Sequence, residues 1–285
     1  MTRVTDEVRQ QPTVWVDGRV LDDAEEPVIR VDDHGFTVGD GVFEAVKVVD
    51  GVPFALSRHL RRLERSATGL GLPPVDQDAV RRAVADVLER RHLPFGRLRI
   101  TLTAGPAPMG SGRTSEGSTT LVVAAVAGPQ KTGPASVVTV PWPRNERGAI
   151  AGLKTTSYAE NVVALAYAHE RGGEEAVFGN LAGHLCEGTG SNVFYAVDGE
   201  LRTPTLASGC LAGITRELLV EWCGVREVDE PLEVLQSADE VFLASTTRDV
   251  QPVARCDDRT WDGPGPLTQA AAETWRQREA EHPDP

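Results

Sequence analysis

The sequence predicts a mixed α/β protein of two domains, and three observations support this fold class. Short alternating apolar segments, which are typical of strands, are interleaved with longer segments of helical periodicity. The 285 residues are enough for two domains that each bury a core. A run of glycine and proline breakers follows residue 127. We therefore expect a smaller N-terminal domain at 1–128, a linker at 129–134 and a larger C-terminal domain at 135–285.

The N-terminal half is expected to alternate strands and helices. Asp50-Gly51 lies between two apolar runs and is typical of a tight hairpin turn. Ser57 is expected to cap a helix with one apolar face, which Gly71 and two prolines terminate. The elements expected in order are strands at 14–16, 28–31, 42–49 and 52–56, helices at 57–70 and 76–92, and strands at 97–103 and 119–127.

The C-terminal half keeps this mixed pattern, and Asp198-Gly199 predicts another hairpin. Its expected elements are strands at 136–140, 176–178, 191–197, 200–202 and 240–244, and helices at 157–171, 213–223 and 268–281. Ligand pockets form preferentially where domains meet. A site between the two halves is therefore the first place to look for function.

Composition argues against several classes of function. The 42 acidic and 29 basic residues give a formal net charge of −13, which disfavours nucleic-acid and anionic-membrane partners. No apolar run is long enough to span a bilayer, and the first residues lack the apolar core of a signal peptide, so we expect a cytoplasmic protein. The four cysteines and six histidines show no metal-ligand spacing, so we expect no metal.

The use of lysine is selective. The 29 basic residues comprise three lysines and therefore 26 arginines. Lys154 directly precedes an expected helix, and a lysine can lose its proton to become a nucleophilic amine, whereas an arginine cannot. The alternative is an ordinary exposed loop lysine. Lys47, within an alternating strand, and Lys131, in the linker, fit that ordinary description better.

Three further segments could bind an anionic or cationic group of a ligand. Gly213-Ile214-Thr215 begins a helix whose free amides form a natural phosphate cradle. Glu187 enters a turn of small residues and could present a carboxylate, and Thr246-Thr247 ends a strand with hydroxyl groups and amides. Each segment has an ordinary alternative: a common helix start, a turn that happens to contain a glutamate, and a Ser/Thr turn.

In this order, the segments resemble the fold-type IV enzymes that use pyridoxal 5′-phosphate, the class IV aminotransferase family. That family contains branched-chain aminotransferases, D-amino-acid aminotransferases and 4-amino-4-deoxychorismate lyases. The resemblance runs from about residue 14 to residue 255 and includes the segments 39–44 and 59–63. It implies the two-domain α/β fold of D-amino-acid aminotransferases, a pyridoxal 5′-phosphate cofactor, a small-molecule amine substrate and a homodimer.

The resemblance also implies roles for individual residues. Lys154 would hold the cofactor covalently and move the proton of the substrate Cα, and Glu187 would keep the pyridine nitrogen protonated. Arg62 would bind the phosphate by a charge-assisted pair. The other implied contacts are Tyr158 at the ring hydroxyl, Asn192 in the Glu187 loop, Leu211 beneath the ring, Gly213, Ile214, Thr215 and Thr246 around the phosphate, and Thr247 on the substrate side.

Departures from the family pattern bear on the substrate. Branched-chain aminotransferases carry a tyrosine five residues after the lysine, where this chain has Ala159 and places its tyrosine one residue earlier. The carboxylate-binding positions of D-amino-acid aminotransferases correspond here to Phe43, Met109 and Ser111. Arg113 is the only cation in that loop and is our candidate for binding a substrate carboxylate, with a flexible surface arginine as the alternative.

The absent clamps favour one activity of the family over the others. We expect 4-amino-4-deoxychorismate lyase, which forms 4-aminobenzoate and pyruvate in folate biosynthesis and needs no oxo-acid acceptor. The alternative is an aminotransferase for D-amino acids, branched-chain amino acids or a bulky amine. A third hypothesis is a catalytically silent homologue that only binds the cofactor. The presence of both Lys154 and Glu187 argues against it, because a binding protein would not require both.

Overall fold

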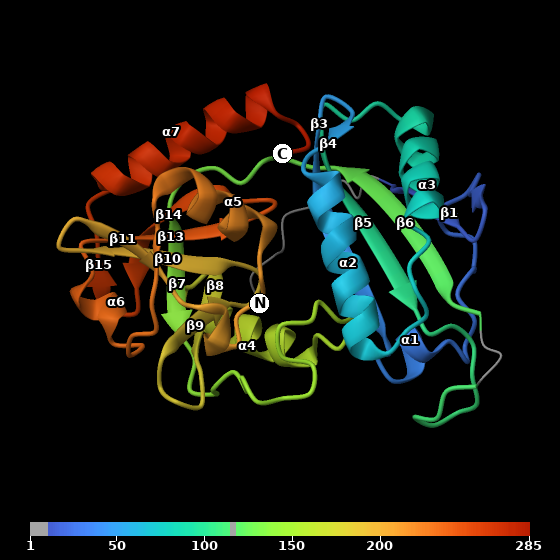
Figure 1. Cartoon of the computed structure of the whole chain (residues 1–285), viewed down its shortest axis with the longest axis horizontal. Coiled ribbons are helices and arrows are strands. Elements are labelled where there is room, and N and C mark those ends of the chain that lie inside the picture. Colours follow the sequence, from blue (N-terminus) through green and yellow to red (C-terminus); the bar gives the residue numbers. More distant parts are fainter. Residues whose placement is uncertain (1–10, 115–117) are drawn as a thin grey trace.

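The computed structural model describes residues 11–114 and 118–285, which form two curved sheets lying side by side (Figure 1). Each sheet carries its own helices and its own hydrophobic core. Residues 128–134 run from the first sheet to the second. The mixed α/β fold class is confirmed, and the domain boundaries given above stay predictions.

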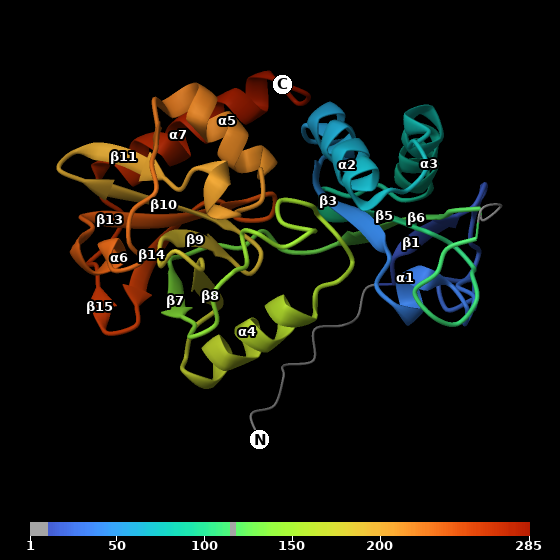
Figure 2. The same ribbon diagram turned by 60° about the horizontal axis from the view of Figure 1, so that its bottom comes forward.

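The first sheet is antiparallel, with strand order β2-β1-β6-β5-β3-β4. Its strands are β1 (Thr13–Val16), β2 (Arg19–Val20), β3 (Gly41–Val49), β4 (Val52–Pro53), β5 (Phe95–Thr103) and β6 (Thr120–Ala127). Helices α2 (Leu56–Leu70) and α3 (Gln77–Arg90) cover one face of this sheet, and the short α1 (His34–Thr37) lies beyond the other (Figure 2). Leu60, Leu63 and Val84 of the two covering helices belong to one core with Val46 and Ile100 of the strands.

The second sheet mixes parallel and antiparallel pairs in the order β12-β11-β10-β13-β14-β7-β8-β9, with β15 paired to β14. Its strands are β7 (Ala135–Thr139), β8 (Glu175–Gly179), β9 (Leu185–Gly188), β10 (Asn192–Val197), β11 (Glu200–Thr203), β12 (Arg226–Glu227), β13 (Glu240–Ser245), β14 (Asp249–Cys256) and β15 (Arg259–Thr260). Its helices are α4 (Ala159–Glu170), α5 (Ile214–Cys223), α6 (Val234–Ser237) and α7 (Pro266–Glu281), with a 3₁₀ turn at Leu206–Ser208. Helices α5 and α7 cover one face, and α4 covers the other (Figure 2).

Tight Asp-Gly turns form both predicted hairpins. At Asp50-Gly51 the φ angles are 48° and 78°, and at Asp198-Gly199 they are 52° and 75°. The left-handed conformation at both central residues matches the twist of antiparallel strands, and aspartate and glycine tolerate it best. Residues 49 and 52, and residues 197 and 200, pair directly across these turns.

Two local predictions in the N-terminal half are wrong. Residues 28–31 form a loop rather than a strand. Ile29 and Val31 are exposed, so these apolar side chains do not pack against the core as those of a strand would. Helix α2 begins at Leu56, and Ala55, with a φ of 54°, takes the N-cap position expected for Ser57. The Ser57 amide instead donates to Oδ1 of Asp284 at 2.8 Å, so a distant residue satisfies this helix start.

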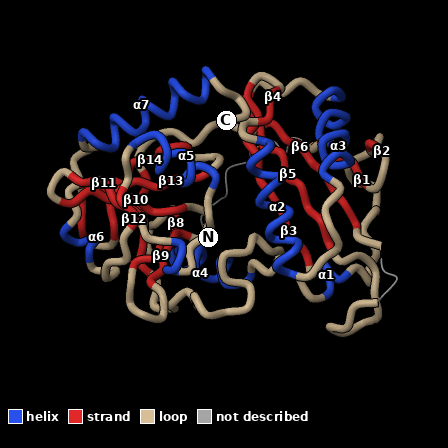
Figure 3. Tube along the Cα trace, in the orientation of Figure 1, coloured by secondary structure: helices blue, strands red, loops and turns tan. Residues whose placement is uncertain are grey.

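Strands β9 and β14 are not predicted by the sequence pattern. β14 is central to the second sheet, where it pairs antiparallel with β13 and parallel with β7 (Figure 3). Its polar residues Gln251 and Arg255, together with Pro252, hide the alternation that indicates a strand. Tertiary pairing therefore decides this element.

Lys47 is buried, which corrects the expectation that it is an ordinary exposed lysine. It lies on β3 and forms ion pairs with Asp249 of β14 and Glu279 of α7. These contacts join β3 of the first sheet to β14 and α7 of the C-terminal half. Lys131 is exposed, as expected for the linker.

Residues 11–114 and 118–285 contain neither a membrane-spanning helix nor a metal-binding cluster. No helix in these ranges is both long and apolar enough to cross a membrane. The same ranges hold no group of three or more His, Cys, Asp or Glu side chains placed to bind a metal.

Candidate active site

A cavity of about 340 Å³ opens between the two sheets. This volume is within the range of small-molecule sites, about 300–1,000 Å³. One wall comes from the first sheet and its helix α2, through Ala45 and Arg62. The other walls are segments of the C-terminal half, namely 144–161, 187–192, 209–215 and 244–247. The cavity is therefore lined by residues of the Lys154, Glu187, Gly213-Ile214-Thr215 and Thr246-Thr247 segments and by Arg62.

Lys154 is held against the first sheet by its backbone. Its N–H donates to Oγ of Ser66 in α2 at 3.1 Å, and its carbonyl oxygen accepts from the Phe43 amide of β3 at 3.0 Å. The Nζ atom lies 4.3 Å from the centroid of the Phe43 ring. Burial and the positive charge of Arg62 lower the pKa of Lys154 to about 8. An amine with this pKa is neutral often enough near pH 7 to act as a nucleophile.

Glu187 of β9 faces the same cavity from the second sheet. Its Oε2 accepts a hydrogen bond from the Leu211 amide at 2.9 Å, and Oε1 lies 3.4 Å from Nε of Arg144. Burial raises the pKa of Glu187, and the charge of Arg144 opposes that rise. Asn192 fixes the facing loop, because its side-chain amide donates to the Leu211 carbonyl at 2.9 Å.

The N-terminus of α5 forms the third part of the site. Gly213 takes the N-cap position and supplies no side-chain cap, so the first amides of the helix are available to an anion. A Cβ at Gly213 would lie 2.0 Å from Oδ1 of Asn192, so only glycine fits here. Ile214, Thr215 and Thr246 line the cavity beside these amides.

Arg62 of α2 completes this anion-binding end. Its Nε and Nη2 donate to Glu44 at 2.8 and 2.6 Å, and Nη1 donates to the Ala212 carbonyl at 2.9 Å. His59 also bonds to Glu44, at 2.7 Å. Despite full burial, the Arg62 and His59 contacts hold the pKa of Glu44 near 2. Glu44 therefore stays ionised and fixes the guanidinium at the cavity wall.

These groups fit pyridoxal 5′-phosphate, the cofactor that the resemblance implies. Lys154 offers an amine to the aldehyde, and the α5 amides with Arg62 offer an anion site to the phosphate. Burial raises the pKa of the Glu187 carboxyl group, so a positively charged ring nitrogen facing it would stabilise its ionised form. When bound, the cofactor supplies the electron-accepting ring that makes the substrate Cα acidic.

The remaining predicted residues divide into two groups. Tyr158 and Thr247 line the cavity, and the Tyr158 hydroxyl donates to the Thr189 carbonyl at 3.3 Å. Phe43 contacts the Tyr158 ring edge to face, with centroids 5.4 Å apart. The roles assigned to these residues stay predictions, as do those of the cofactor contacts above.

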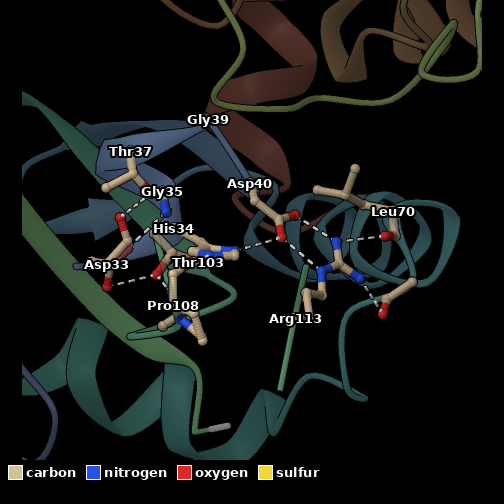
Figure 4. A network of polar contacts seen from close by, with 12 residues as sticks. Asp33, His34, Gly35, Thr37, Gly39, Asp40, Leu70, Thr103, Pro108 and Arg113 are labelled. Carbon is tan, nitrogen blue, oxygen red and sulfur yellow. Dashed lines mark hydrogen bonds and ion pairs between the residues drawn. The ribbon is translucent and has the colours of Figure 1, made fainter. Parts of the chain in front are cut away.

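Met109 and Arg113 lie apart from this cavity. The Met109 side chain is 77% exposed and does not reach Lys154 or Glu187. The Arg113 guanidinium forms an ion pair with Asp40 and donates to the carbonyls of Leu70 and Gly71 at the end of α2 (Figure 4). These partners occupy Arg113, so it ties the 105–113 loop to α2, and we do not retain it as the residue that binds a substrate carboxylate.

Three charged residues at the site are absent from the sequence prediction. Glu44 lies inside the 39–44 motif. The signal that could have indicated it is a single glutamate among the apolar residues of a strand. Arg144 precedes Lys154 in a polar loop and carries no local signal. Arg99 of β5 pairs across the sheet with Ala45 of the cavity wall, so the strand register places it, and register is not readable from sequence alone.

Comparison with known proteins agrees with this geometry. The family model for class IV amino-transferases matches residues 41–256. A provisionally assigned branched-chain-amino-acid aminotransferase of Methanocaldococcus jannaschii is 31% identical over 255 residues, covering 86% of this chain and 88% of that protein. The D-alanine aminotransferase of Bacillus licheniformis is 30% identical, covering 90% and 93%. A bifunctional aminodeoxychorismate lyase and D-amino acid transaminase of Mycobacterium tuberculosis is 31% identical, covering 79% and 83%.

Solved structures show the same relationship. The branched-chain aminotransferase of Thermoproteus uzoniensis with norvaline superposes with a TM-score of 0.86 at 29% identity, covering 93% of each chain. A hypothetical aminotransferase from Mycobacterium tuberculosis in its pyridoxal-phosphate-bound form gives a TM-score of 0.83 at 27% identity, covering 93% of this chain and 97% of that one. The fold is therefore fold-type IV. The chain belongs to the class IV aminotransferase family, whose members use pyridoxal 5′-phosphate.

Proposed function

We propose that this protein is an aminotransferase that exchanges the amino group of an apolar, branched-chain-type L-amino acid with an acidic 2-oxo acid. The family and the relatives that carry aminotransferase names support the reaction class and rank it above the lyase expected from the sequence. One observation of the site carries the substrate class: Arg99 is a cation near Lys154 that has no carboxylate partner within residues 11–114 and 118–285.

Arg99 lies on β5 beside the cavity wall and is exposed. It pairs with Ala45 of the cavity wall, and its guanidinium lies 3.9 Å from the centroid of the Phe43 ring. That ring is in turn 4.3 Å from Nζ of Lys154. The only hydrogen bond described for the Arg99 side chain is from Nε to Oγ1 of Thr101, at 3.2 Å, which leaves both terminal nitrogens for a carboxylate. The surrounding protein lowers the pKa of Arg99 by desolvation, so a substrate anion would be favoured there.

The side-chain environment supports an apolar amino donor. Ala45, Ile150 and Leu153 line the cavity without charge. The polar clamp of D-amino-acid aminotransferases corresponds here to Phe43, Met109 and Ser111, and Met109 points to solvent. An apolar L-amino acid is therefore a better fit to this chain than a small D-amino acid.

The residues would divide the work as follows. Lys154, with a pKa of about 8, would take the Cα proton and return it at the neighbouring carbon. Glu187 would hold a positive charge on the ring nitrogen, and Arg62 with the α5 amides would anchor the phosphate. The Tyr158 ring would stand between Phe43 and the turn of Thr189, which limits the entry of water to this side.

The test is a substrate panel with a matched pair of arginine variants. Wild-type protein loaded with cofactor is given L-leucine, L-valine, D-alanine and L-glutamate with the corresponding oxo acids. We expect transamination of the branched-chain substrates with 2-oxoglutarate as acceptor. Arg99→Gln should raise the KM for 2-oxoglutarate about tenfold or more, the usual loss for a charge-assisted contact. Arg97→Gln, two residues earlier on the same strand, should leave this KM unchanged. Transamination of D-alanine alone, or an unchanged KM in Arg99→Gln, would contradict the proposal.

A lyase activity is the second candidate. The observation in its favour is the 31% identity to a bifunctional lyase and D-amino acid transaminase. The two activities separate cleanly, because the lyase needs no oxo-acid acceptor. Release of pyruvate from 4-amino-4-deoxychorismate without any oxo acid would establish the lyase and place the protein in folate biosynthesis.

We further propose that the protein is a cytoplasmic homodimer. Segment 31–38, which includes α1, and the adjoining 105–113 loop expose Val31, Phe36, Val38 and Met109, at 69%, 71%, 44% and 77%. An isolated pair of such residues is ordinary, but four on contiguous segments favour a protein partner. Light scattering of the loaded protein should give twice the chain mass of 30.6 kDa, and Phe36→Asp should lower that mass. A single-chain mass for the wild-type protein would exclude the dimer.

A further inference from the structure

We propose that Arg144 is a positioning residue whose guanidinium holds the Glu187 carboxylate in place and keeps it an anion throughout the reaction. The inference rests on the proposed function, since Glu187 matters only if a cofactor ring nitrogen faces it. No motif in the sequence points to Arg144. Its case comes from four independent contacts around one side chain.

The backbone of Arg144 is fixed to the end of β8. Its N–H donates to the Gly179 carbonyl at 2.8 Å, and it forms an isolated bridge with Asn180. The guanidinium lies over the ring of Phe178, with 4.1 Å between the guanidinium carbon and the ring centroid. The side chain is 16% exposed, so the protein and not solvent defines its orientation.

The nitrogens of this guanidinium are assigned to different partners. Nη1 donates to Oε2 of Glu160 at 2.6 Å, and Nη2 donates to Oδ1 of Asn161 at 2.7 Å. Both partners belong to the start of α4. Nε is buried and makes no hydrogen bond to the described residues, yet it lies 3.4 Å from Oε1 of Glu187. The two contacts to α4 therefore hold the guanidinium beside the Glu187 carboxylate, where Nε forms an ion pair and not a hydrogen bond with Oε1.

Several charged groups act on Glu187. Burial raises its pKa and the carboxylate of Glu175 adds to the rise, whereas Arg144, the Leu211 amide and Lys154 lower it. Tyr158, Cys186 and Cys210 also face Glu187, and each has a raised pKa that keeps it neutral near pH 7.

The two cations near Glu187 differ in one respect. Lys154 changes its bonding and its charge as it reacts, so it cannot supply a constant field. Arg144 stays protonated at every accessible pH. Of the side chains that lower the pKa of Glu187, only Arg144 therefore acts equally in every step. Without it, Glu187 would tend to take up a proton, and a neutral carboxyl group would stabilise a positive ring nitrogen poorly.

The experiment is a pH titration of the visible absorption of bound pyridoxal 5′-phosphate, which reports the proton on its bond to Lys154. In Arg144→Gln, the less positive ring should let that bond keep its proton to higher pH. Loss of an opposite charge shifts the pKa of its direct neighbour, here Glu187, by about one to three units. We expect the midpoint of the cofactor–lysine bond to rise by a fraction of that shift, because the effect reaches it through Glu187 and the ring. Arg147→Gln is the matched control, because Arg147 lies on the same loop, is 80% exposed and pairs only with the carboxylate of Glu146 among the described residues.

Two further variants separate orientation of the carboxylate from general damage. Arg144→Met keeps the contact with Phe178 and replaces Arg144→Gln if the latter does not fold. Arg144→Lys restores the charge and should return the midpoint part of the way to the wild-type value. In a Glu187→Gln background, the Arg144 substitution should have no further effect, because the group through which it acts is gone.

The outcomes distinguish this inference from the proposed function. If wild-type protein gains no visible band with pyridoxal 5′-phosphate, the proposed function fails. If wild-type protein gains the band, and Arg144→Gln and Arg144→Met fold, load cofactor and titrate with the wild-type midpoint, only the role of Arg144 fails. A midpoint that moves equally in Arg147→Gln also overturns it, because the effect would then be a general one of charge.

Discussion

The two ends of the cavity differ in how their charges are partnered. At the cofactor end, the Arg62 guanidinium contacts both Glu44 and the Ala212 carbonyl, and Glu187 lies between the Leu211 amide and Arg144. At the substrate end, Arg99 has no carboxylate partner in the part of the chain that the structure describes. The proposed cofactor end thus carries charges that already have partners, whereas the proposed substrate end keeps a cation available for a ligand.

The largest effect should come from the charge that faces the ring. Glu187→Gln keeps the hydrogen bond to the Leu211 amide through its side-chain carbonyl but removes the negative charge. We expect the variant to bind pyridoxal 5′-phosphate and to lose activity by about two orders of magnitude or more, since positioned charge acts mainly on the transition state. Single-turnover rates measure this loss. Wild-type turnover in the variant would show that the cofactor end does not depend on this charge.

Glu44 should produce the largest change in stability. Glu44→Gln leaves the buried Arg62 without its counter-charge, which typically costs about 3–5 kcal/mol of unfolding free energy. The folded pKa is about 2 and the reference value 4.5, so this contribution is present above pH 4.5 and is lost as pH falls toward 2. Urea unfolding across that range should therefore show the gap between variant and wild type closing.

The control for Glu44 is Glu26→Gln, which removes a surface ion pair with Arg19. We expect it to leave the unfolding free energy close to the wild-type value, because solvent screens exposed pairs and they contribute little. Equal losses of unfolding free energy in Glu44→Gln and Glu26→Gln would mean that the buried ion pair contributes no more to stability than the exposed one.

A smaller effect is expected from the glycine at the start of α5. Gly213→Ala places a Cβ where Oδ1 of Asn192 now lies, so the loop and the amides of the anion site must shift. Cofactor affinity should fall about tenfold, or about 1.4 kcal/mol. Gly112→Ala, in the 105–113 loop away from the cavity, is the matched control, because a Cβ there meets nothing within 4 Å. Fluorescence titration with cofactor measures both. Equal affinities would show that the anion site tolerates movement.

The smallest effect should come from Arg113. Arg113→Gln removes the ion pair with Asp40 and the bonds to the last carbonyls of α2. The guanidinium is about one-third exposed, so solvent weakens these contacts, and we expect a loss near 1 kcal/mol in unfolding free energy. Cofactor affinity should stay at the wild-type value. A large fall in cofactor affinity would show that the 105–113 loop takes part in cofactor binding, and would contradict the difference between the two ends.

The same division explains what the sequence could predict. Lys154, Glu187 and Gly213 lie next to helix starts, turns and strand ends that leave local signals, and all three face one cavity. Arg99 and Arg144 are single arginines among 26, and only strand register and the packing of a loop bring them to the site. Arg113 shows the converse case, in which the local pattern indicates a ligand contact and the fold pairs the residue with Asp40.

The fold divides in a similar way. The hairpin turns and the amphipathic helices α2 and α3 follow from local residues, with bounds within a few positions of those predicted. β14 does not, because Pro252 and polar neighbours obscure its alternation and two other strands determine its place. Elements fixed by distant partners are the ones that sequence reasoning misses.

The start of α2 has a consequence for the order in which the chain is made. Asp284 caps this helix across 227 positions of sequence, and the Pro283 carbonyl accepts the Ala55 amide at 2.7 Å. During synthesis, the first sheet is therefore complete long before its main helix has its N-terminal partners. The helix that carries Arg62 and Ser66 would reach its final rigidity only after α7 has emerged and docked. A ribosome-bound chain stopped before residue 280 should consequently contain a folded first sheet. Its site should bind pyridoxal 5′-phosphate more weakly than the finished chain does.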